Sequence, residues 1–325
     1  KMKKKILITG STGFIGSNLV KRLIGKGHNV ISIDNDFRGS KKRLESISGD
    51  IELHNVDVRD KTKLMQMSVG CDYFFHLAYI NGTENFYSQP GNVLDVGIKG
   101  IINAFECCIE NKIDNLFIAS SSEVLHEPEI IPTNENAPIK IPDISNPRYS
   151  YAGGKILYEL LGKHFAKNEI KRVVIFRPFN VYGPDMGMGH VIPQLINRIR
   201  ENKLHLKLDK ANTLDFEIQG DGTQTRAFEH IEDFIDGIEI LMEKGVDREI
   251  YNIGNDEEIS INQLVSKIFK SINTDIKINL KHSHLPEGGT NRRCPDISKL
   301  KDLGYVPRIL IDDGLPAVVE YYLNC

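Results

Sequence analysis

Short apolar runs alternate with longer amphipathic stretches along the first half of the chain. The runs are rich in Val, Ile, Leu and Phe, which is typical of buried strands, and the stretches between them place apolar residues at helical spacing. The predicted strands are Ile6–Thr9, Asn29–Asp34, Ile51–Asn55, Tyr73–His76, Leu116–Ser120 and Val173–Arg177. The predicted helices are Gly16–Lys26, Asp60–Val69, Val93–Asn111 and Tyr149–Asn168. This alternation predicts an α/β fold with a doubly wound parallel sheet and helices on both faces.

The pattern becomes irregular after Pro184. Leu204–Gln219 is predicted to be one long extended segment, and Ser260 is placed to cap a helix. The remaining predicted elements are helices at His190–Glu201, His230–Lys244 and Ser260–Ser271, strands at Glu249–Ile253 and Lys277–Leu280, and closing segments at Ile297–Leu303 and Ile311–Tyr322. We expect residues 1–180 to form the sheet lobe, with residues 228–254 returning to it. Residues 181–325 would form a smaller mixed α/β lobe that binds the substrate.

Composition and charge narrow the class of protein. The 325 residues include 40% hydrophobic and 26% charged residues, and Lys plus Arg number 41 against 44 for Asp plus Glu. This balance gives no indication of a nucleic-acid or membrane partner, and no apolar stretch approaches the ~18 residues of a membrane span. Five cysteines show no metal-binding spacing and are expected to be reduced, buried thiols. We expect a cytoplasmic protein without a metal site.

Three glycines follow the first strand with the spacing G-x-x-G-x-x-G and open a helix. Gly10 allows a tight turn, Gly13 lets the backbone approach a pyrophosphate, and Gly16 lets the helix pack closely against the sheet. A pyrophosphate would then lie at the helix N-terminus beside Phe14 and Ile15, where free N–H groups and the helix dipole favour an anion. The segment predicts a Rossmann-type dinucleotide site.

The ends of the next strands supply candidates for the rest of this site. Asp34 suits a carboxylate that accepts ribose hydroxyls and repels a 2′-phosphate, which favours NAD over NADP. Arg38 lies close enough in sequence to weaken the preference for NAD. Polar residues at a single strand end are also common where a loop simply begins. The other candidate cofactor-binding residues are Asn35, Asp57, Val58, Leu77 and Ala78.

Tyr151 and Lys155 are four residues apart on a predicted helix, so the phenol and the ammonium share one face. A phenol with a pKa of about 10 is a poor base at neutral pH. An ammonium ~5 Å away supplies roughly 3 kcal/mol toward its ionisation at an effective dielectric constant of ~20, and a positive nicotinamide ring adds to this. The spacing alone arises by chance in many helices. Ser120–Ser122, at the end of the fifth strand, supports the assignment because a hydroxyl there can bridge a substrate alcohol and the tyrosine oxygen.

Together these motifs resemble the extended short-chain dehydrogenase/reductases that act on nucleotide sugars, and the resemblance covers nearly the whole chain. It extends through Arg177–Pro184, Gln224–Phe228, Asn252–Gly254 and Arg292–Asp296. The resemblance implies that Tyr151 is the base on the sugar hydroxyl, that Lys155 tunes it and holds the nicotinamide ribose, and that Ser121 aligns the substrate. It implies NAD as cofactor and a nucleotide-diphosphate sugar as substrate. The implied substrate-binding residues are Ser122, Asn180, Arg226 and Arg292.

Three departures from the family pattern leave the sugar open. Leu125–His126 stands where the family commonly has Tyr-Gly, and Gly97 stands where members often carry an asparagine. The stretch at residues 204–219 is longer than usual beside the expected substrate pocket.

The family's reactions begin with oxidation at C4 of the sugar and differ in the fate of the 4-keto product. We expect 4-epimerisation first, because it needs only reduction from the other face. A 4,6-dehydratase is an alternative. One group of the family's dehydratases supplies the required acid and base as Asp-Glu, but here Ser122 stands at the position of the aspartate and only Glu123 is present. A UDP-glucuronate decarboxylase is another: Ser-Ser-Glu-Val and Arg-Arg-x-Pro-Asp-Ile resemble its motifs, although Ala152–Gly154 replaces its acidic pair. Glu123 would be catalytic in either. A non-catalytic dinucleotide-binding regulator stays a remote alternative, because such relatives tend to lose the Tyr or the Lys.

The two longest predicted helices carry more apolar residues than one sheet face needs. In relatives the equivalent helices build a four-helix dimer interface, so we expect a homodimer. The residues concerned are Ile98, Ile101, Ile102, Phe105, Ile156, Leu157, Leu160 and Leu161.

Overall fold

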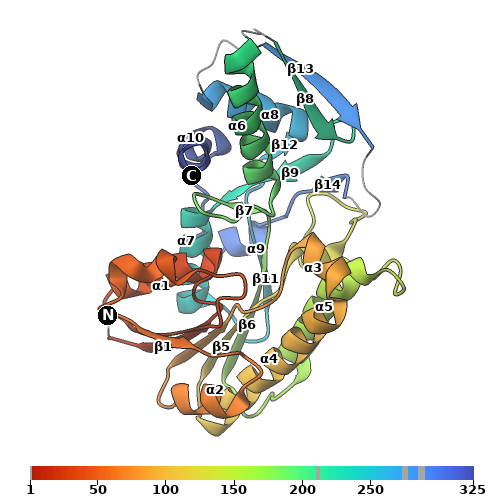
Figure 1. Ribbon diagram of the computed structural model, residues 1–325. Coiled ribbons are helices and arrows are strands. Elements are labelled where there is room, and N and C mark those ends of the chain that lie inside the picture. Colours follow the sequence, from red (N-terminus) through yellow and green to blue (C-terminus); the bar gives the residue numbers. More distant parts are fainter. Residues whose placement is uncertain (1, 210–212, 273–276, 285–289) are drawn as a thin grey trace.

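The computed structural model describes residues 2–209, 213–272, 277–284 and 290–325, and its larger lobe is built on a seven-stranded sheet (Figure 1). The strands are β1 (Lys5–Thr9), β2 (Asn29–Asp34), β3 (Glu52–Asn55), β4 (Tyr73–His76), β5 (Asn115–Ala119), β6 (Arg172–Pro178) and β11 (Ile250–Ile253). Their order is β11-β6-β5-β4-β1-β2-β3, and every neighbouring pair is parallel. The predicted doubly wound α/β fold is confirmed.

Helices cover both faces of this sheet, and the alternation of side chains along each strand feeds the two cores. Ile6 and Ile8 of β1 pack in one core and Leu7 packs in the other. The first core contains residues from α1 (Phe14–Gly25), α7 (Ile231–Lys244) and α9 (Ser298–Lys301). The second contains residues from α2 (Lys61–Met67), α4 (Pro90–Glu110) and α5 (Ser150–His164). Because both faces are buried, the central strands are rich in apolar residues, whereas the edge strand β3 is polar and largely exposed.

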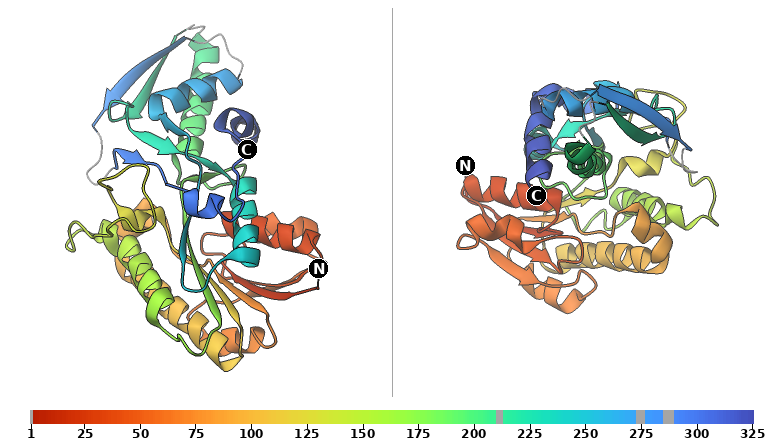
Figure 2. Two further views of the ribbon diagram at one scale, coloured as in Figure 1. Left: turned by 180° about the vertical axis from the view of Figure 1, so that it is seen from behind. Right: turned by 45° about the horizontal axis from the view of Figure 1, so that its top comes forward.

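A smaller lobe lies above the carboxyl ends of the strands (Figures 1 and 2). Its core is a third apolar cluster, distinct from the two that flank the sheet. The elements are α6 (Val191–Asp209), α8 (Ile261–Ile272), α10 (Ile311–Asn324), the parallel pair β8 (Thr213–Gln219) and β13 (Lys277–Ser283), and the short strands β7 (Val181–Tyr182), β9 (Thr225–Ala227), β10 (Glu229–His230), β12 (Glu258–Ser260) and β14 (Arg292–Arg293). Between α7 and β12 the chain returns to the sheet as β11, which pairs with β6.

Ser260 caps α8 as predicted. Its Oγ accepts from the backbone N–H of Gln263 at 3.1 Å, and the Gln263 side chain accepts from the Ser260 N–H at 2.8 Å. This reciprocal pair is a capping box, which satisfies two donors at the start of the helix.

Two sequence predictions are corrected. The segment from Leu204 is not extended, because residues up to Asp209 continue α6 and only Thr213–Gln219 forms a strand; residues 210–212 lie outside the described part. From Leu204 the sequence alternates Leu with polar residues, which is the pattern of a half-buried strand. Leu and Lys are also good helix formers, however, and adding a turn to an existing helix costs little free energy. The cysteines are all free, and Cys325 is exposed rather than buried.

The sheet order places the first crossing point between β1 and β4, where consecutive connections leave toward opposite faces. In open α/β sheets this is where ligands bind, beyond the carboxyl ends of the strands. None of the helices in the described part of the chain is long and apolar enough to cross a membrane.

Candidate active site

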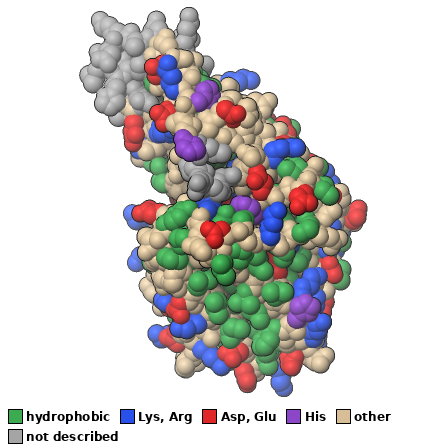
Figure 3. Space-filling view, turned by 90° about the vertical axis from the view of Figure 1, so that its right-hand side faces the viewer, with side chains coloured by type: hydrophobic (Ala, Val, Ile, Leu, Met, Phe, Trp, Pro, Cys, Tyr) green, Lys and Arg blue, Asp and Glu red, His purple; other side chains and the backbone are tan. Residues whose placement is uncertain are grey.

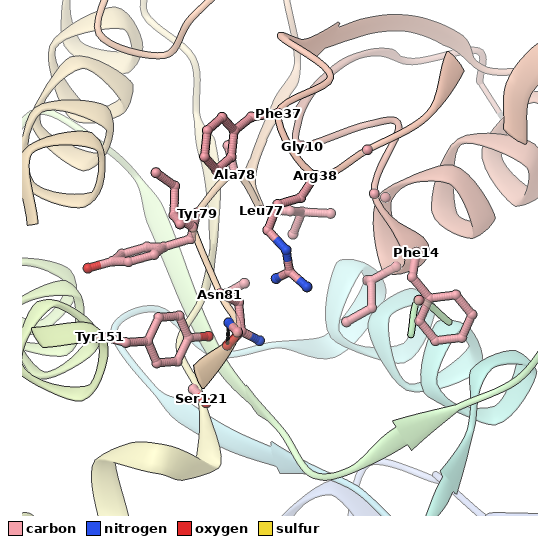
Figure 4. Close-up of a pocket in the computed structure, with 18 of the residues that line it drawn as sticks. Gly10, Phe14, Phe37, Arg38, Leu77, Ala78, Tyr79, Asn81, Ser121 and Tyr151 are labelled. Carbon is pink, nitrogen blue, oxygen red and sulfur yellow. Dashed lines mark hydrogen bonds between the residues drawn. The ribbon is translucent and has the colours of Figure 1, made fainter. Parts of the chain in front are cut away.

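A cavity of about 440 Å³ opens at this crossing point, between the sheet and the smaller lobe (Figure 4). Most of the residues predicted from sequence line it: Gly10, Gly13, Phe14, Ile15, Gly16, Asp34, Asn35, Asp57, Val58, Leu77, Ala78, Ser121, Ser122, Glu123, Tyr151, Lys155 and Asn180. The strand ends therefore converge on one cleft, as the parallel order requires.

The glycine turn has the close backbone packing that a dinucleotide site needs. Gly10 has a φ of +72°, and a Cβ there would lie 2.8 Å from the Ala78 nitrogen. A Cβ on Gly16 would overlap the Gly10 carbonyl oxygen. Side chains at these positions would displace the turn from the N-terminus of α1, where we expect a pyrophosphate to bind. The residues present therefore fit NAD.

Asp34 is held rigidly at the end of β2. Its carboxylate accepts the backbone N–H of Thr12 at 3.0 Å and that of Asp36 at 2.9 Å. These bonds fix the carboxylate at the cavity wall where adenosine ribose hydroxyls are expected. Arg38, four residues further, directs its guanidinium into the cavity (Figure 4) and has its pKa lowered by burial.

Tyr151 lies near the start of α5 with its hydroxyl directed into the cavity, near Ser121 (Figure 4). Its ring stacks on Phe86, with centroids 5.1 Å apart, and meets the edge of Tyr79 at 5.0 Å. Burial raises the pKa of Tyr151 to about 12, although a hydrogen bond with Ser121 acts in the opposite direction. In this setting a smaller fraction of Tyr151 is ionised at neutral pH than of free tyrosine.

Lys155, one turn along α5, is buried and donates from Nζ to the Ala119 carbonyl at 2.6 Å. Burial lowers the pKa of Lys155 to about 7. We expected its charge to offset the high pKa of Tyr151, but in the protein alone the burial of both groups outweighs that effect. Bound NAD supplies a positive nicotinamide ring and the hydride acceptor.

Glu123 forms an ion pair with Arg293 in the same cavity, with Oε1 and the guanidinium nitrogen 2.5 Å apart. Burial alone would raise the pKa of Glu123, but the guanidinium groups of Arg293, Arg148 and Arg226 together keep it below its usual value. Glu123 is therefore a carboxylate at neutral pH. The buried Nε of Arg293 has no hydrogen-bond partner among the described residues.

Sequence reasoning selected Arg292 and missed Arg293. Arg292 is half exposed and pairs with Glu258 at 2.6 Å, whereas Arg293 is buried against the cavity. Successive side chains of a strand point to opposite sides, so the two arginines of β14 cannot both face the site. Arg226 also stays outside the cavity wall of the described structure and donates to the Thr290 carbonyl at 2.7 Å. Substrate contacts by Arg226 and Arg292 stay predictions.

A buried network fixes the serine segment against α5. Arg177 of β6 and Glu159 of α5 form a two-pronged ion pair with both distances 2.7 Å, and Ser120 donates to the same carboxylate at 2.6 Å. The hydroxyl of Ser120 is thus engaged by Glu159, while Ser121 faces Tyr151. The network explains how β5 and α5 hold Ser121, Tyr151 and Lys155 together.

The glycine turn, the fixed Asp34 and the Ser-Tyr-Lys group define a dinucleotide-dependent short-chain dehydrogenase/reductase. The sequence model of the NAD dependent epimerase/dehydratase family matches residues 6–254. The chain belongs to this family, and its cofactor is NAD.

Proteins similar to nearly the whole of this chain include decarboxylases and an epimerase of nucleotide sugars. The chain is 31% identical to a UDP-N-acetyl-alpha-D-glucosaminuronate decarboxylase of Bacillus cytotoxicus, over 99% of this chain and 98% of the relative. It is also 31% identical to UDP-glucuronic acid decarboxylase 1 of Xenopus tropicalis, over 99% of this chain and 73% of the relative. Among solved structures, a UDP-N-acetylglucosamine 4-epimerase of Methanobrevibacter ruminantium aligns with a TM-score of 0.86 and 25% identity, covering 100% of this chain and 99% of the other.

Proposed function

We propose that this protein is an NAD-dependent decarboxylase of a nucleotide-activated hexuronic acid. The observation that carries the proposal is the Glu123–Arg293 pair beside Tyr151, because it places one carboxylate and a buried guanidinium next to the base that takes the proton when C4 is oxidised. Arg293 has a spare buried N–H for the sugar carboxylate. Two relatives that decarboxylate UDP-hexuronates support the choice.

The chemistry follows from the 4-keto product. Tyr151 takes the proton of the 4-hydroxyl while hydride leaves C4, and Ser121 holds the same oxygen. The ketone lies two bonds from the sugar carboxylate, so the C5–C6 bond can break with its electron pair passing to the carbonyl oxygen. CO₂ leaves, a proton from water adds at C5, and hydride returns to C4 while Tyr151 gives its proton back to the C4 oxygen.

Glu123 and Arg293 act on the departing group in this scheme. Arg293 orients the substrate carboxylate by donating its spare Nε–H in a charge-assisted hydrogen bond. Glu123 is ionised, so it repels the substrate carboxylate, and the repulsion disappears when neutral CO₂ leaves. Glu123 thereby favours the transition state over the bound substrate.

The 4-epimerase expected from sequence is the second candidate. The structural similarity to a UDP-N-acetylglucosamine 4-epimerase favours it, as does the absence of acidic residues at Ala152–Gly154. In that reaction Tyr151 and Ser121 would have the same roles and the ketone would be reduced from its other face. A dehydratase is less favoured because Ser122 occupies the position of a catalytic aspartate.

Product analysis separates these candidates. The protein with NAD would be incubated with UDP-glucuronate, UDP-N-acetylglucosaminuronate, UDP-glucose and UDP-N-acetylglucosamine, and products followed by mass spectrometry and proton NMR. Loss of the mass of CO₂ from a uronate supports the proposal. An unchanged mass with inverted C4 establishes an epimerase, loss of water a dehydratase, and either outcome would overturn the decarboxylase assignment.

A further inference from the structure

Tyr79 occupies a space between α4 and α5 that two glycines create. A Cβ on Gly97 of α4 or on Gly154 of α5 would overlap its phenol oxygen. Figure 4 shows the hydroxyl directed away from the cavity, opposite to that of Tyr151. The oxygen is buried and has no hydrogen-bond partner in the described part of the chain, so the hydroxyl itself does not hold the ring there.

The Tyr79 ring lies between the two reactive groups of α5. Its edge meets Tyr151 with centroids 5.0 Å apart, and the Lys155 Nζ lies 4.4 Å from its centre. Tyr158 places a second ring 4.4 Å from the same ammonium. Tyr158 is in turn fixed by bonds to His76 at 3.0 Å and to the Gly97 carbonyl at 3.2 Å. The Ala119 carbonyl and the rings of Tyr79 and Tyr158 therefore lie closest to the Lys155 ammonium, with the Tyr151 ring further away at 5.6 Å.

We propose that Tyr79 is a positioning residue for catalysis: its ring, accommodated by Gly97 and Gly154, holds the Lys155 ammonium charged and directed at the Ala119 carbonyl beside Tyr151. The inference rests on the proposed roles of Tyr151 and Lys155. Aromatic faces attract cations within about 6 Å, and the attraction increases where water is excluded. It thus opposes the desolvation that otherwise favours neutral Lys155.

An NMR test needs no substrate and so is independent of the proposed reaction. In spectra of the protein labelled with ¹³C at lysine Cε, the rings should shift the Cε signal of Lys155 upfield. The signal is assigned to Lys155 because it is absent from the spectrum of Lys155→Arg. Tyr79→Leu keeps an apolar side chain but removes the ring; it should reduce the upfield shift and lower the titration point of Lys155 by roughly 0.5 to 1 pH unit. Tyr79→Phe keeps the ring and should preserve both signals.

Turnover provides the catalytic readout. With the sugar nucleotide that the wild-type protein converts, Tyr79→Leu should reduce kcat about tenfold with little change in KM. The pH range in which Tyr79→Leu is active should become narrower. Its alkaline limit should move to lower pH because Lys155 loses its proton at lower pH, and its acid limit should move to higher pH because Tyr151 becomes harder to ionise. A purely structural role would lower stability without moving these limits.

Gly97→Ala provides a second route if Tyr79→Leu fails to fold, because the added Cβ displaces the same ring. It should reproduce the reduced upfield shift. A wild-type Lys155 resonance and titration in folded Tyr79→Leu, or in folded Gly97→Ala, would overturn the role of Tyr79. Absence of turnover in the wild-type protein, with the ring-dependent Lys155 signals present, would instead reject the proposed function alone.

Discussion

At the residue scale, the reactive tyrosine lies where its ionised form is disfavoured. Burial raises the pKa of Tyr151 to about 12 and lowers that of Lys155 to about 7, so at neutral pH Tyr151 is protonated and Lys155 is only partly charged. This differs from the prediction made from helical spacing alone. Spacing specifies which side chains share a helix face, but not how deeply the fold buries them.

Tyr151→Phe removes one hydroxyl and keeps the ring between Phe86 and Tyr79. We expect turnover to fall by roughly 10²–10⁴-fold because proton transfer from the sugar hydroxyl is lost. NAD binding, measured by calorimetry, and the thermal unfolding midpoint should stay close to those of the wild-type protein. Activity near the wild-type level would show that another group is the base.

Glu123→Gln preserves shape but removes the charge that Arg293 neutralises. If the protein is a decarboxylase, this variant should lose more than about a hundredfold in turnover, because the repulsion of the substrate carboxylate disappears. The rate of CO₂ release from the active uronate would be measured alongside the unfolding midpoint. A loss below about tenfold would favour 4-epimerisation, in which the carboxylate has no required step.

At the scale of elements, the sequence predicted the sheet strands and long helices to within a few residues, because each buried strand is an unbroken apolar run. The prediction was wrong at residues 204–209, where the apolar pattern fits both a helix and a strand. Sequence patterns also could not predict contacts between residues that are far apart in the chain. The Glu123–Arg293 pair joins residues 170 positions apart, so no local pattern indicates it. The choice between Arg292 and Arg293 depends on the register of the two-residue strand β14.

The buried ion pair between α5 and β6 is expected to determine the stability of the site. Glu159 and Arg177 are 3% and 1% exposed, and removing one partner leaves an uncompensated buried charge. Glu159→Ala should lower the free energy of unfolding by about 3–5 kcal/mol. Urea denaturation would measure this, with Glu232→Ala, in the more exposed ion pair with Arg22, as the control for a pair of small effect. Equal effects of the two substitutions would show that the buried pair does not anchor α5.

At the scale of the whole molecule, the cofactor residues come from the sheet lobe, while Arg293 reaches the cavity from the smaller lobe. The cleft therefore brings together Tyr151, the proposed base, and Arg293, the residue assigned to the sugar carboxylate. The same two-lobe arrangement leaves the outer face of α4 and α5 uncovered by the chain itself (Figures 1 and 3).

That face is where we expect a second copy to bind. Ile101 and Phe105 are buried in the sheet core, but Leu94 and Ile98 of α4 and Leu160 of α5 are 36%, 40% and 53% exposed. Figure 3 shows apolar side chains gathered over this region, and patches of this kind mark interfaces. We predict a homodimer whose two-fold axis passes between the paired helices.

Leu160→Glu tests this arrangement because the two-fold axis would bury both copies of the new charge. We expect it to weaken the dimer by at least about a hundredfold, so that light scattering at micromolar concentration gives the mass of one chain. Val306→Glu is the matched control, since Val306 is an apolar residue that is 64% exposed outside α4 and α5. A dimer that persists in Leu160→Glu would place the interface elsewhere, and a monomeric wild-type protein would reject the prediction.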